Sequence, residues 1–232
     1  MRFNRAIGKI KVLSFDLDDT LYDNHPIIAS ALRAQADYLQ QLPTWPHQDN
    51  RFWMACRHKA LKAHPELLHD VTLWRQRALY FGLLECGLTP EDALDHAQKA
   101  YAAFAHARSQ ISVCPSVIKL LNNLKQRYTL IAITNGNADV EQFNLAGMFS
   151  LVLQAGKDGR SKPFRDLFDN AVNQLNMHPS QLLHIGDSLD TDVQGANNAN
   201  CRSVWLNNQN CTYHYQGLAD IEISDIKQLQ YF

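Results

Sequence analysis

Four short segments carry side chains that could together transfer a phosphoryl group. The first holds two carboxylates at alternating positions, Asp16 and Asp18, directly after an apolar run. The other three are Thr134-Asn135-Gly136, Ser161-Lys162-Pro163 and Gly186-Asp187 through Asp192. Phosphoryl transfer requires an in-line nucleophile, cations on the equatorial oxygens and a proton donor for the leaving oxygen. These segments contain residue types suited to all three tasks.

The chemistry of each side chain predicts its role. We expect Asp16 to be the nucleophile, and Asp18 to protonate the leaving alkoxide and later to deprotonate the attacking water. Asp16 and Asp187 offer hard oxygen ligands, which suit Mg²⁺. The remaining polar groups would hold phosphoryl oxygens: the hydroxyl of Thr134, the backbone amides of Asn135 and Gly136, and the ammonium of Lys162.

Each segment also has an ordinary structural explanation. Acidic turns are commonly solvated or cap helices, and Thr134 could be a plain β-branched strand residue. Lys162 could be a surface lysine, and Asp192 could lie in the first turn of a helix. A calcium loop is excluded because Leu21 and Ile27 stand where that loop needs glycine and glutamate. The functional interpretation therefore depends on the joint occurrence of the four segments.

Other catalytic motifs are missing from the sequence. No Gly-x-Gly-x-x-Gly follows a predicted strand, and residues 156–161 lack the Gly-Lys-Ser/Thr end of a nucleotide-binding P-loop. There is no His-Glu-x-x-His pair, and His184 lies inside an apolar run, where a core residue is expected rather than a ligand. We therefore predict neither nucleoside triphosphate hydrolysis nor a zinc site.

Short apolar runs place these segments on a predicted parallel sheet. The runs are 11–15, 130–134, 182–185 and 203–206, with 151–153 as a shorter fifth. Helical patterns at about 115–127, 138–147, 163–175 and 190–199 alternate with them, which predicts an α/β, doubly wound fold. Ligands of such sheets bind beyond the carboxyl ends of the strands, where three of the four segments begin. The remaining segment, Ser161-Lys162-Pro163, stands at the start of a predicted helix, and we expect all four to converge.

Residues 22–110 contain no strand-like run and are predicted to be helical. Apolar residues recur at helical spacing from Ile27 to Leu42, and Thr89-Pro90 resembles a cap followed by a first helical residue. Gly87 is expected to end the helix before it. Because this block interrupts the alternation of strands and helices, we interpret it as an inserted helical domain, with 1–21 and 111–232 forming the core.

The balance of charged residues limits the kinds of molecule that the protein is expected to bind. With 22 Lys+Arg and 23 Asp+Glu in 232 residues, the net charge of -1 gives no global attraction for nucleic acid or anionic lipid. We therefore expect a small phosphorylated metabolite as partner, and no nucleic acid or membrane. Five scattered cysteines without a Cys-x-x-Cys pair, and the lack of a long apolar run, favour a cytoplasmic protein with reduced thiols. The oligomeric state is left open.

The four segments resemble the motifs of the haloacid dehalogenase-like hydrolase superfamily. The resemblance implies a Rossmann-like core, a helical cap inserted after the first motif, and Mg²⁺. It also implies that Asp16 is the nucleophile and a metal ligand, that Asp187 is a ligand, and that Asp18 contributes its backbone carbonyl to the metal. Asp192 would support the site from behind these ligands, through Lys162 or a water.

Asp18 distinguishes branches of this superfamily, because its dehalogenases and phosphonate-cleaving members do not keep an acidic residue there. The resemblance thus favours a phosphatase or a phosphomutase. Segments 15–24, 69–75, 133–137 and 159–163 look like the bacterial flavin mononucleotide phosphatase group. That group is linked to riboflavin biosynthesis and removes phosphate from a ribitylaminouracil precursor.

The helical block is the expected source of substrate selectivity, with Arg75, Trp74 and Tyr22 as candidate contacts. Arg75 and Trp74 could present donors and a flat ring to a heterocycle or its ribityl hydroxyls. Trp74 also lies at helical spacing with Val71 and Ala78, which is typical of core packing. A phosphosugar phosphatase or a phosphomutase would share all core motifs. A non-catalytic binding module would require the loss of a catalytic position, and none is lost.

Overall fold

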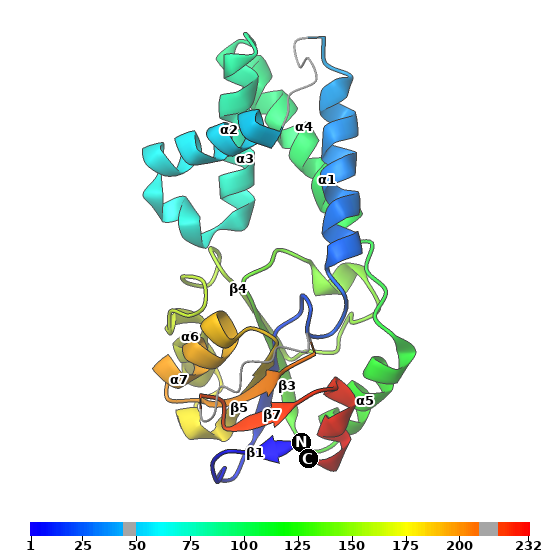
Figure 1. The fold of residues 1–232 in the computed structure, drawn as a ribbon, viewed down its shortest axis with the longest axis vertical. Helices are drawn as coiled ribbons and strands as arrows, with labels where there is room; N and C mark the ends of the chain where they lie inside the picture. Colours follow the sequence, from blue (N-terminus) through cyan, green and yellow to red (C-terminus); the bar gives the residue numbers. More distant parts are fainter. Residues whose placement is uncertain (44–49, 209–217) are drawn as a thin grey trace. The chain divides into compact units, whose positions relative to one another are not determined.

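The computed structural model describes residues 1–43, 50–208 and 218–232, so Cys211 lies outside the described residues. The chain packs as two compact units (Figure 1). The core unit comprises Met1–Asp23, Ser112–Gly136 and Val140–Phe232, and the helical unit comprises Asn24–Ile111 with Asn137–Asp139. Tyr22 and Asp23, which the sequence assigns to the helical insertion, therefore pack with the core unit.

The core unit contains a seven-stranded sheet in the order β1-β7-β6-β5-β2-β3-β4. Its strands are β1 (Arg2–Phe3), β2 (Val12–Phe15), β3 (Thr129–Thr134), β4 (Leu151–Gln154), β5 (Leu182–Gly186), β6 (Arg202–Leu206) and β7 (Ile221–Ile223). All neighbouring strands are parallel except β1 and β7, which confirms the predicted α/β fold. Strands β1 and β7 were not predicted, because their two and three residues are too short for a readable pattern.

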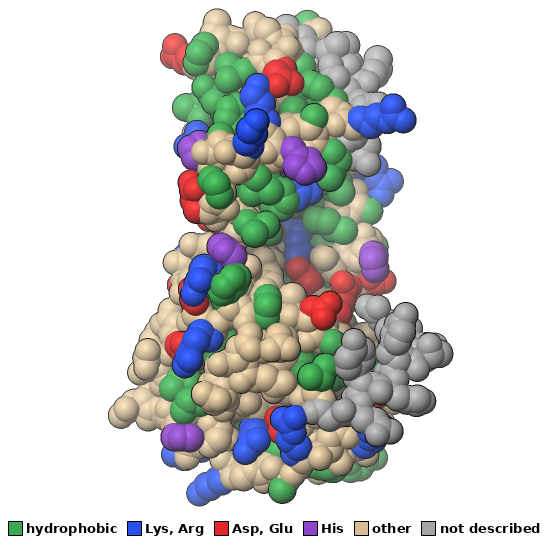
Figure 2. Space-filling view, turned by 60° about the vertical axis from the view of Figure 1, so that its left-hand side comes forward, with side chains coloured by type: hydrophobic (Ala, Val, Ile, Leu, Met, Phe, Trp, Pro, Cys, Tyr) green, Lys and Arg blue, Asp and Glu red, His purple; other side chains and the backbone are tan. Residues whose placement is uncertain are grey.

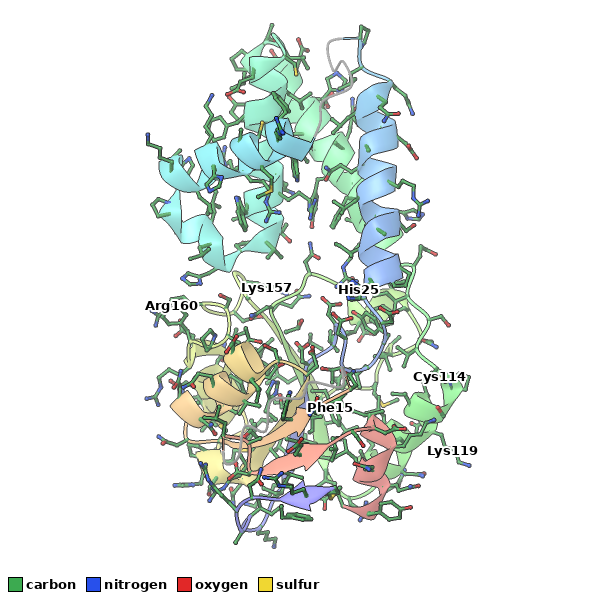
Figure 3. All side chains as sticks on the ribbon, viewed as in Figure 1. Phe15, His25, Cys114, Lys119, Lys157 and Arg160 are labelled. Atoms are coloured by element: carbon green, nitrogen blue, oxygen red, sulfur yellow. The ribbon has the colours of Figure 1, made fainter. Side chains whose placement is uncertain are left out.

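Strand β2 lies at the centre of the sheet and is buried along its whole length. Phe15, its last residue, is opposite Ala132 of β3 and Ile185 of β5 and is labelled in Figure 3. The chain after β2 continues to β3 on one side and, later, to β5 on the other. Such a change of direction opens a crevice at the carboxyl ends of the strands, and it places the residues after β2, β3 and β5 together.

Helices cover both faces of the sheet. Figure 1 shows α6 (Asp166–Gln174) and α7 (Gln194–Asn198) on one side of it and α5 (Pro115–Lys125) with η5 (Ile226–Tyr231) on the other. Helix α6 buries Leu167, Phe168 and Ala171 against apolar residues of β3 and β4. Short 3₁₀ segments η2 (Val140–Gln142) and η3 (Pro179–Gln181) and a π-helical turn η4 (Leu189–Val193) complete the described core unit.

Three of the expected helices in the core differ from the structure. The helix expected over 138–147 is wrong, because only η2 forms there. The side-chain amide of Asn144 bonds both backbone groups of Val113 at 2.9 Å, which holds this stretch as an irregular loop. The helix expected from residue 163 begins at Asp166, whose carboxylate accepts hydrogen bonds from Arg160. The helix expected over 190–199 is divided into η4 and the five-residue α7.

The helical unit consists of α1 (His25–Gln40), α2 (Asn50–Ala63), η1 (Pro65–His69), α3 (Val71–Glu85) and α4 (Pro90–Arg108). Its core joins Leu39 of α1 with Leu79 and Leu83 of α3 and with three alanines of α4. The predicted ends of α3 and α4 are confirmed: Gly87 has a φ of 89°, and the Thr89 hydroxyl accepts a hydrogen bond from the Asp92 amide at 3.2 Å.

Surface charge is dispersed. On the face shown in Figure 2, lysine and arginine side chains are separated by acidic, apolar and other groups. This distribution agrees with the net charge of -1 and gives that face no continuous basic surface for nucleic acid. Of the helices in the described ranges, none combines the length and apolar character that a membrane crossing needs.

Candidate active site

Lys162 and Asp16 form a buried ion pair at the carboxyl end of β2. The ammonium nitrogen of Lys162 lies 2.7 Å from Asp16 Oδ1, 2.6 Å from Asp192 Oδ1 and 2.8 Å from the carbonyl oxygen of Ile133. An ammonium has three protons, so these acceptors use its full donor capacity. Residues more than 140 positions apart in the chain therefore meet because β2, β3 and the segment before α6 converge.

Three carboxylates cluster here, and two of them, Asp16 and Asp192, contact the Lys162 ammonium. Oxygens of Asp16, Asp187 and Asp192 all lie within 4.8 Å of one another. Burial raises the pKa of Asp16 to about 8 although Lys162 opposes the shift, and burial with the charge of Asp192 raises the pKa of Asp187 to about 6. The site thus has an excess of negative charge, which a divalent cation would neutralise.

The donor set fits Mg²⁺. Hard carboxylate oxygens are its usual protein ligands, and Asp16 and Asp187 provide them at the end of adjacent strands. The Thr20 hydroxyl donates to Asp187 Oδ1 at 3.3 Å, and the Trp205 indole donates to the Asp187 backbone carbonyl at 2.9 Å. These two contacts orient Asp187, and neither of them was predicted from the sequence.

The Asp192 carboxylate accepts hydrogen bonds from three groups of the core unit. Its Oδ1 accepts from Lys162 and from His184 Nε2 at 3.1 Å, and its Oδ2 accepts from the Ser188 amide at 3.0 Å. Burial disfavours its charge, but Lys162 and His184 together hold the pKa of Asp192 below its ordinary value. Gly186 makes room for this arrangement, since a Cβ there would lie 2.2 Å from Asp192 Cγ.

Asp18 is held by two neighbours within the core unit. The Tyr22 hydroxyl donates to Asp18 Oδ1 at 2.7 Å, and the Tyr22 ring packs edge-on against Phe143 at 6.0 Å between centroids. A Cβ on Gly136 would lie 2.4 Å from Asp18 Oδ2, so only glycine permits this approach. The sequence places Tyr22 on the cap as a substrate contact, whereas the structure places it beside the expected acid/base residue.

The loop after β3 is ordered by its own side chains. Thr134 Oγ1 accepts from the Gly136 amide at 2.9 Å, which leaves the Thr134 hydroxyl hydrogen to serve as a donor. The Asn135 side chain accepts from the Lys162 amide at 2.7 Å and donates to the Lys162 carbonyl at 3.0 Å. Asn135 was predicted to contribute only its backbone, yet its amide side chain fixes the backbone of Lys162.

These groups line one cavity of about 170 Å³ in the core unit. Its lining includes Asp16, Asp18, Thr134, Lys162 and Asp187, so the structure brings together the predicted catalytic side chains. Pockets for drug-sized molecules are about 300 to 1,000 Å³. The cavity therefore suits a phosphoryl group with a cation, and a bulky leaving group needs further surface.

Trp74 and Arg75 direct their polar groups to partners within the helical unit. The Trp74 indole donates to the Arg57 carbonyl at 3.0 Å, and the Arg57 guanidinium covers its ring at 3.9 Å. The Arg75 guanidinium lies 3.8 Å from the centre of the Phe104 ring, and its Nη1 donates to Gln35 Oε1 at 3.3 Å. Burial lowers the pKa of Arg75 to about 10. This packing favours the core interpretation of Trp74.

His184 is a fully buried residue whose two ring nitrogens both have partners, Ser14 Oγ at 2.9 Å and Asp192 Oδ1 at 3.1 Å. This confirms the prediction of a core histidine. The hydrogen bond between His184 and Asp192 was not predicted. A signal was available, because residues two positions apart in a strand share a face, and His184 stands two positions before Gly186, where the Gly186-Asp187 motif begins. The signals for Thr20 and Trp205 are weaker, since their partners are distant in sequence.

Known proteins are similar to this chain in sequence and in fold. A protein 40% identical over 99% of this chain and 98% of its own length is the 5-amino-6-(5-phospho-D-ribitylamino)uracil phosphatase YigB of Escherichia coli. A phosphoserine phosphatase of Thermus thermophilus is 27% identical over 95% of this chain and 98% of its own. A solved structure named 2-haloacid dehalogenase, from Pseudomonas syringae pv. Tomato DC3000, has a TM-score of 0.91 and 34% identity, covering 96% of this chain and 97% of that one.

The model of one protein family, haloacid dehalogenase-like hydrolase, matches residues 10–200. This range contains all four segments, from Asp16 to Asp192, together with the helical unit between the first and the second. The sheet order and the cluster around Asp16 agree with that match. The chain belongs to the haloacid dehalogenase-like hydrolase family.

Proposed function

We propose that this phosphatase hydrolyses phosphate monoesters of small metabolites, with Asp16 as the nucleophile and Mg²⁺ as cofactor. One observation carries the proposal: the Asp16 carboxylate lies in a small polar cavity, 2.7 Å from the Lys162 ammonium, with Asp18 and Thr134 in the same lining. A nucleophile, a cation, hydrogen-bond donors and a second carboxylate are the groups that phosphoryl transfer requires.

In the first step, an Asp16 oxygen attacks phosphorus and the bond from phosphorus to the leaving oxygen breaks. Asp18 gives its proton to that oxygen, so the leaving group departs as an alcohol. The product on the protein is an aspartyl phosphate. In the second step, Asp18 takes a proton from water, the hydroxyl oxygen attacks phosphorus, and inorganic phosphate leaves while the Asp16 carboxylate is restored.

The other residues of the site would bind the phosphoryl oxygens, hold Mg²⁺ and keep the Lys162 ammonium in place. The Thr134 hydroxyl and the backbone amide of Asn135 would bind the phosphoryl oxygens. The Lys162 ammonium and the Gly136 amide would do so by exchanging a present acceptor, Asp16 or Thr134, for a phosphoryl oxygen. Asp16, Asp187 and the backbone carbonyl of Asp18 would hold Mg²⁺. When bound, Mg²⁺ supplies positive charge that offsets the repulsion between carboxylates and phosphate. Asp192 would keep Lys162 in place, as its hydrogen bond of 2.6 Å indicates.

Asp18 supports ester hydrolysis over dehalogenation, although one similar structure bears a dehalogenase name. A halide leaves as a stable anion and needs no proton, whereas an alkoxide needs one. The Asp18 carboxylate, which accepts a hydrogen bond of 2.7 Å from the Tyr22 hydroxyl, can supply the proton that only the alkoxide needs.

For the substrate, we propose a ribityl phosphate ester. The Escherichia coli relative acts on 5-amino-6-(5-phospho-D-ribitylamino)uracil, as its name states. Flavin mononucleotide carries the same ribityl phosphate arm on a larger ring, and is the second candidate. A role in riboflavin biosynthesis, in the cytoplasm, would follow. Because the cavity of about 170 Å³ holds little more than the phosphoryl group, the ring must be recognised outside it.

A panel of esters tests the proposal. Phosphate release is measured with Mg²⁺ for ribitylaminouracil phosphate, flavin mononucleotide, phosphoserine and glucose 6-phosphate, with Asp16→Asn as the inactive control. We expect the two ribityl esters to have kcat/KM at least about tenfold above the others, a preference of roughly 1.4 kcal/mol. A preference for sugar phosphates would favour a phosphosugar phosphatase. Isomerisation of a sugar phosphate without net phosphate release would show a phosphomutase.

Arg75 is the helical-unit residue that we propose to select the leaving group. Arg75→Ala should lower kcat/KM for the ribityl esters more than for p-nitrophenyl phosphate, because the second ester offers no ribityl hydroxyls to a guanidinium. Trp74→Phe, which keeps an aromatic ring in the helical unit, is the matched control. Equal losses on all esters would leave Arg75 with a packing role only.

A further inference from the structure

His184 is a polar side chain at the centre of the sheet. It is 0% exposed, on the central part of β5, and directly opposite Ser14 of β2 in the parallel register. The edge of its ring meets the Phe168 ring at right angles, with 5.0 Å between centroids. An imidazole in such surroundings destabilises the fold unless its nitrogens are hydrogen-bonded. Both of its ring nitrogens have such partners, and one of these partners is Asp192 of the candidate site.

The partners of His184 define its protonation. An ionised carboxylate only accepts hydrogen bonds, so the contact of 3.1 Å with Asp192 Oδ1 assigns the proton to Nε2. Nδ1 then accepts from the Ser14 hydroxyl at 2.9 Å. Burial lowers the pKa of His184, even though Asp192 favours the charged form. The residue is therefore a neutral imidazole with one donor, aimed at Asp192.

That donor reaches the nucleophile through two further contacts. Asp192 Oδ1 accepts from His184 and, at 2.6 Å, from Lys162, whose ammonium lies 2.7 Å from Asp16. The Ser188 amide binds only the other oxygen of Asp192. Without His184, Asp192 would keep Lys162 on Oδ1 and the Ser188 amide on Oδ2, and it would lose the contact that fixes Oδ1 independently of Lys162. The position of the Lys162 ammonium depends on that carboxylate.

We propose that His184 is a positioning residue of the hydrolase reaction, whose Nε2 proton fixes Asp192 so that Lys162 is held against Asp16. The inference rests on the proposed function and adds a residue to it. His184 itself touches neither the substrate nor the reacting atoms. Its effect on phosphoryl transfer passes entirely through Asp192 and Lys162.

Two amide substitutions separate this role from packing. In His184→Gln the side-chain amide reaches about as far as Nε2 and can donate to Asp192, whereas in His184→Asn it reaches about as far as Nδ1 and can meet only Ser14. Ser14→Ala is the matched control, because it removes the other hydrogen bond of the imidazole. Thermal unfolding of each variant first establishes that it is folded, and His184→Phe replaces His184→Asn if the latter does not fold.

Kinetics with p-nitrophenyl phosphate and Mg²⁺ give the first readout. Partners behind a metal site typically change activity by about 10 to 100-fold. We expect that loss in kcat for His184→Asn, with KM within about threefold of wild type. His184→Gln should recover kcat to within about fivefold of wild type, and Ser14→Ala should retain it to the same extent. A wild-type kcat in folded His184→Asn, or equal losses in the Gln and Asn variants, would overturn the proposal.

Hydrogen exchange of the Lys162 ammonium gives a second readout that needs no turnover. Lys162 is the lysine that is buried in the described ranges, so its ¹⁵N-labelled ammonium should exchange more slowly than those of the other lysines. We expect exchange at least about tenfold faster in His184→Asn, and near wild type in His184→Gln. If wild type hydrolyses no ester, the proposed function fails, and this exchange alone decides the role of His184. Unchanged exchange in His184→Asn would contradict it.

Discussion

The Tyr22 hydroxyl donates a hydrogen bond of 2.7 Å to Asp18 Oδ1, within the loop that follows β2. The same residues form an isolated parallel β-bridge through their backbones. Gly136 approaches the other oxygen of Asp18 so closely that no larger residue fits. The proposed acid/base carboxylate therefore has a close neighbour at each of its two oxygens, Tyr22 at one and Gly136 at the other.

Asp18→Asn should remove the proton transfer while leaving the nucleophile in place. We expect kcat to fall by about 10² to 10⁴-fold for alkyl phosphates. The formation of phospho-Asp16 from p-nitrophenyl phosphate should fall much less, because p-nitrophenolate leaves without a proton. Rapid-quench measurement of both esters tests this, and equal losses in the first step would refute the acid role.

Tyr22→Phe should weaken the orientation of Asp18 without removing it. A single hydrogen bond to a charged group contributes about 1.5 to 3 kcal/mol, so the loss in kcat for alkyl phosphates should be at most about 10 to 100-fold. The Phe143 contact is retained by the phenyl ring. The double variant Tyr22→Phe/Asp18→Asn should be no slower than Asp18→Asn, and additive losses would show that Tyr22 acts elsewhere.

Gly136→Ala should displace Asp18. A Cβ at this position would be 2.4 Å from Asp18 Oδ2 and 3.3 Å from Thr134 Oγ1, so the carboxylate must move. We expect a loss in kcat for alkyl phosphates similar to that of Asp18→Asn, about 10² to 10⁴-fold. Gly147→Ala is a useful contrast, because a Cβ there meets nothing within 4 Å and only its φ of 67° is unfavourable. Normal turnover in Gly136→Ala would contradict the close approach of Asp18 to this glycine.

Lys162→Met should destabilise the fold as well as stop catalysis. Removing one partner of a buried ion pair destabilises by about 3 to 5 kcal/mol, since the other charge is left unpaired. Adding Asp192→Asn should recover part of this loss in urea unfolding, because it removes one uncompensated carboxylate. The exposed Lys99→Ala, which breaks a surface pair with Asp95, is the control and should unfold near wild type.

Stability of the magnesium-free protein should decrease as the pH rises from about 6.5 to 8. Burial raises the pKa of Asp16 from 3.8 to about 8, so in this range the folded state binds a proton that the unfolded state has lost. The sign is therefore opposite to that of an ordinary paired carboxylate. Lower pH is less informative, because neutral His184, with its pKa below 6.5, contributes in the other direction.

Thermal unfolding of metal-free wild type and Asp16→Asn across that range measures the effect. The decrease in Tm should be absent from Asp16→Asn, and Mg²⁺ should stabilise wild type more at pH 8 than at pH 6.5, because the cation competes with the proton. Parallel curves for the two proteins would show that Asp16 does not titrate there.

The sequence alone determined the fold class and the order of the catalytic segments. Five apolar runs predicted β2 to β6, because buried parallel strands are continuously apolar and easily read. Since chemistry gathers at the carboxyl ends of such strands, Asp16, Thr134 and Asp187 could be placed together from their positions in the chain. The caps of α3 and α4 were readable for a similar reason, as they depend only on neighbouring residues.

Only the tertiary structure decided which side chains form hydrogen bonds with one another, both between residues distant in sequence and within single loops. The loop at 138–147 has a helical pattern, but Asn144 pairs with the backbone of Val113, 31 positions away. Tyr22 follows the last core residue expected from the sequence, and its contacts with Asp18 and Phe143 assign it to the core. From the sequence, His184 is an ordinary core residue. In the structure, the register of β5 and the π-helical turn η4 bring Asp192 to its Nε2 atom. Hydrogen-bond partners depend on geometry that apolar periodicity does not encode, and the positioning of this active site depends on such partners.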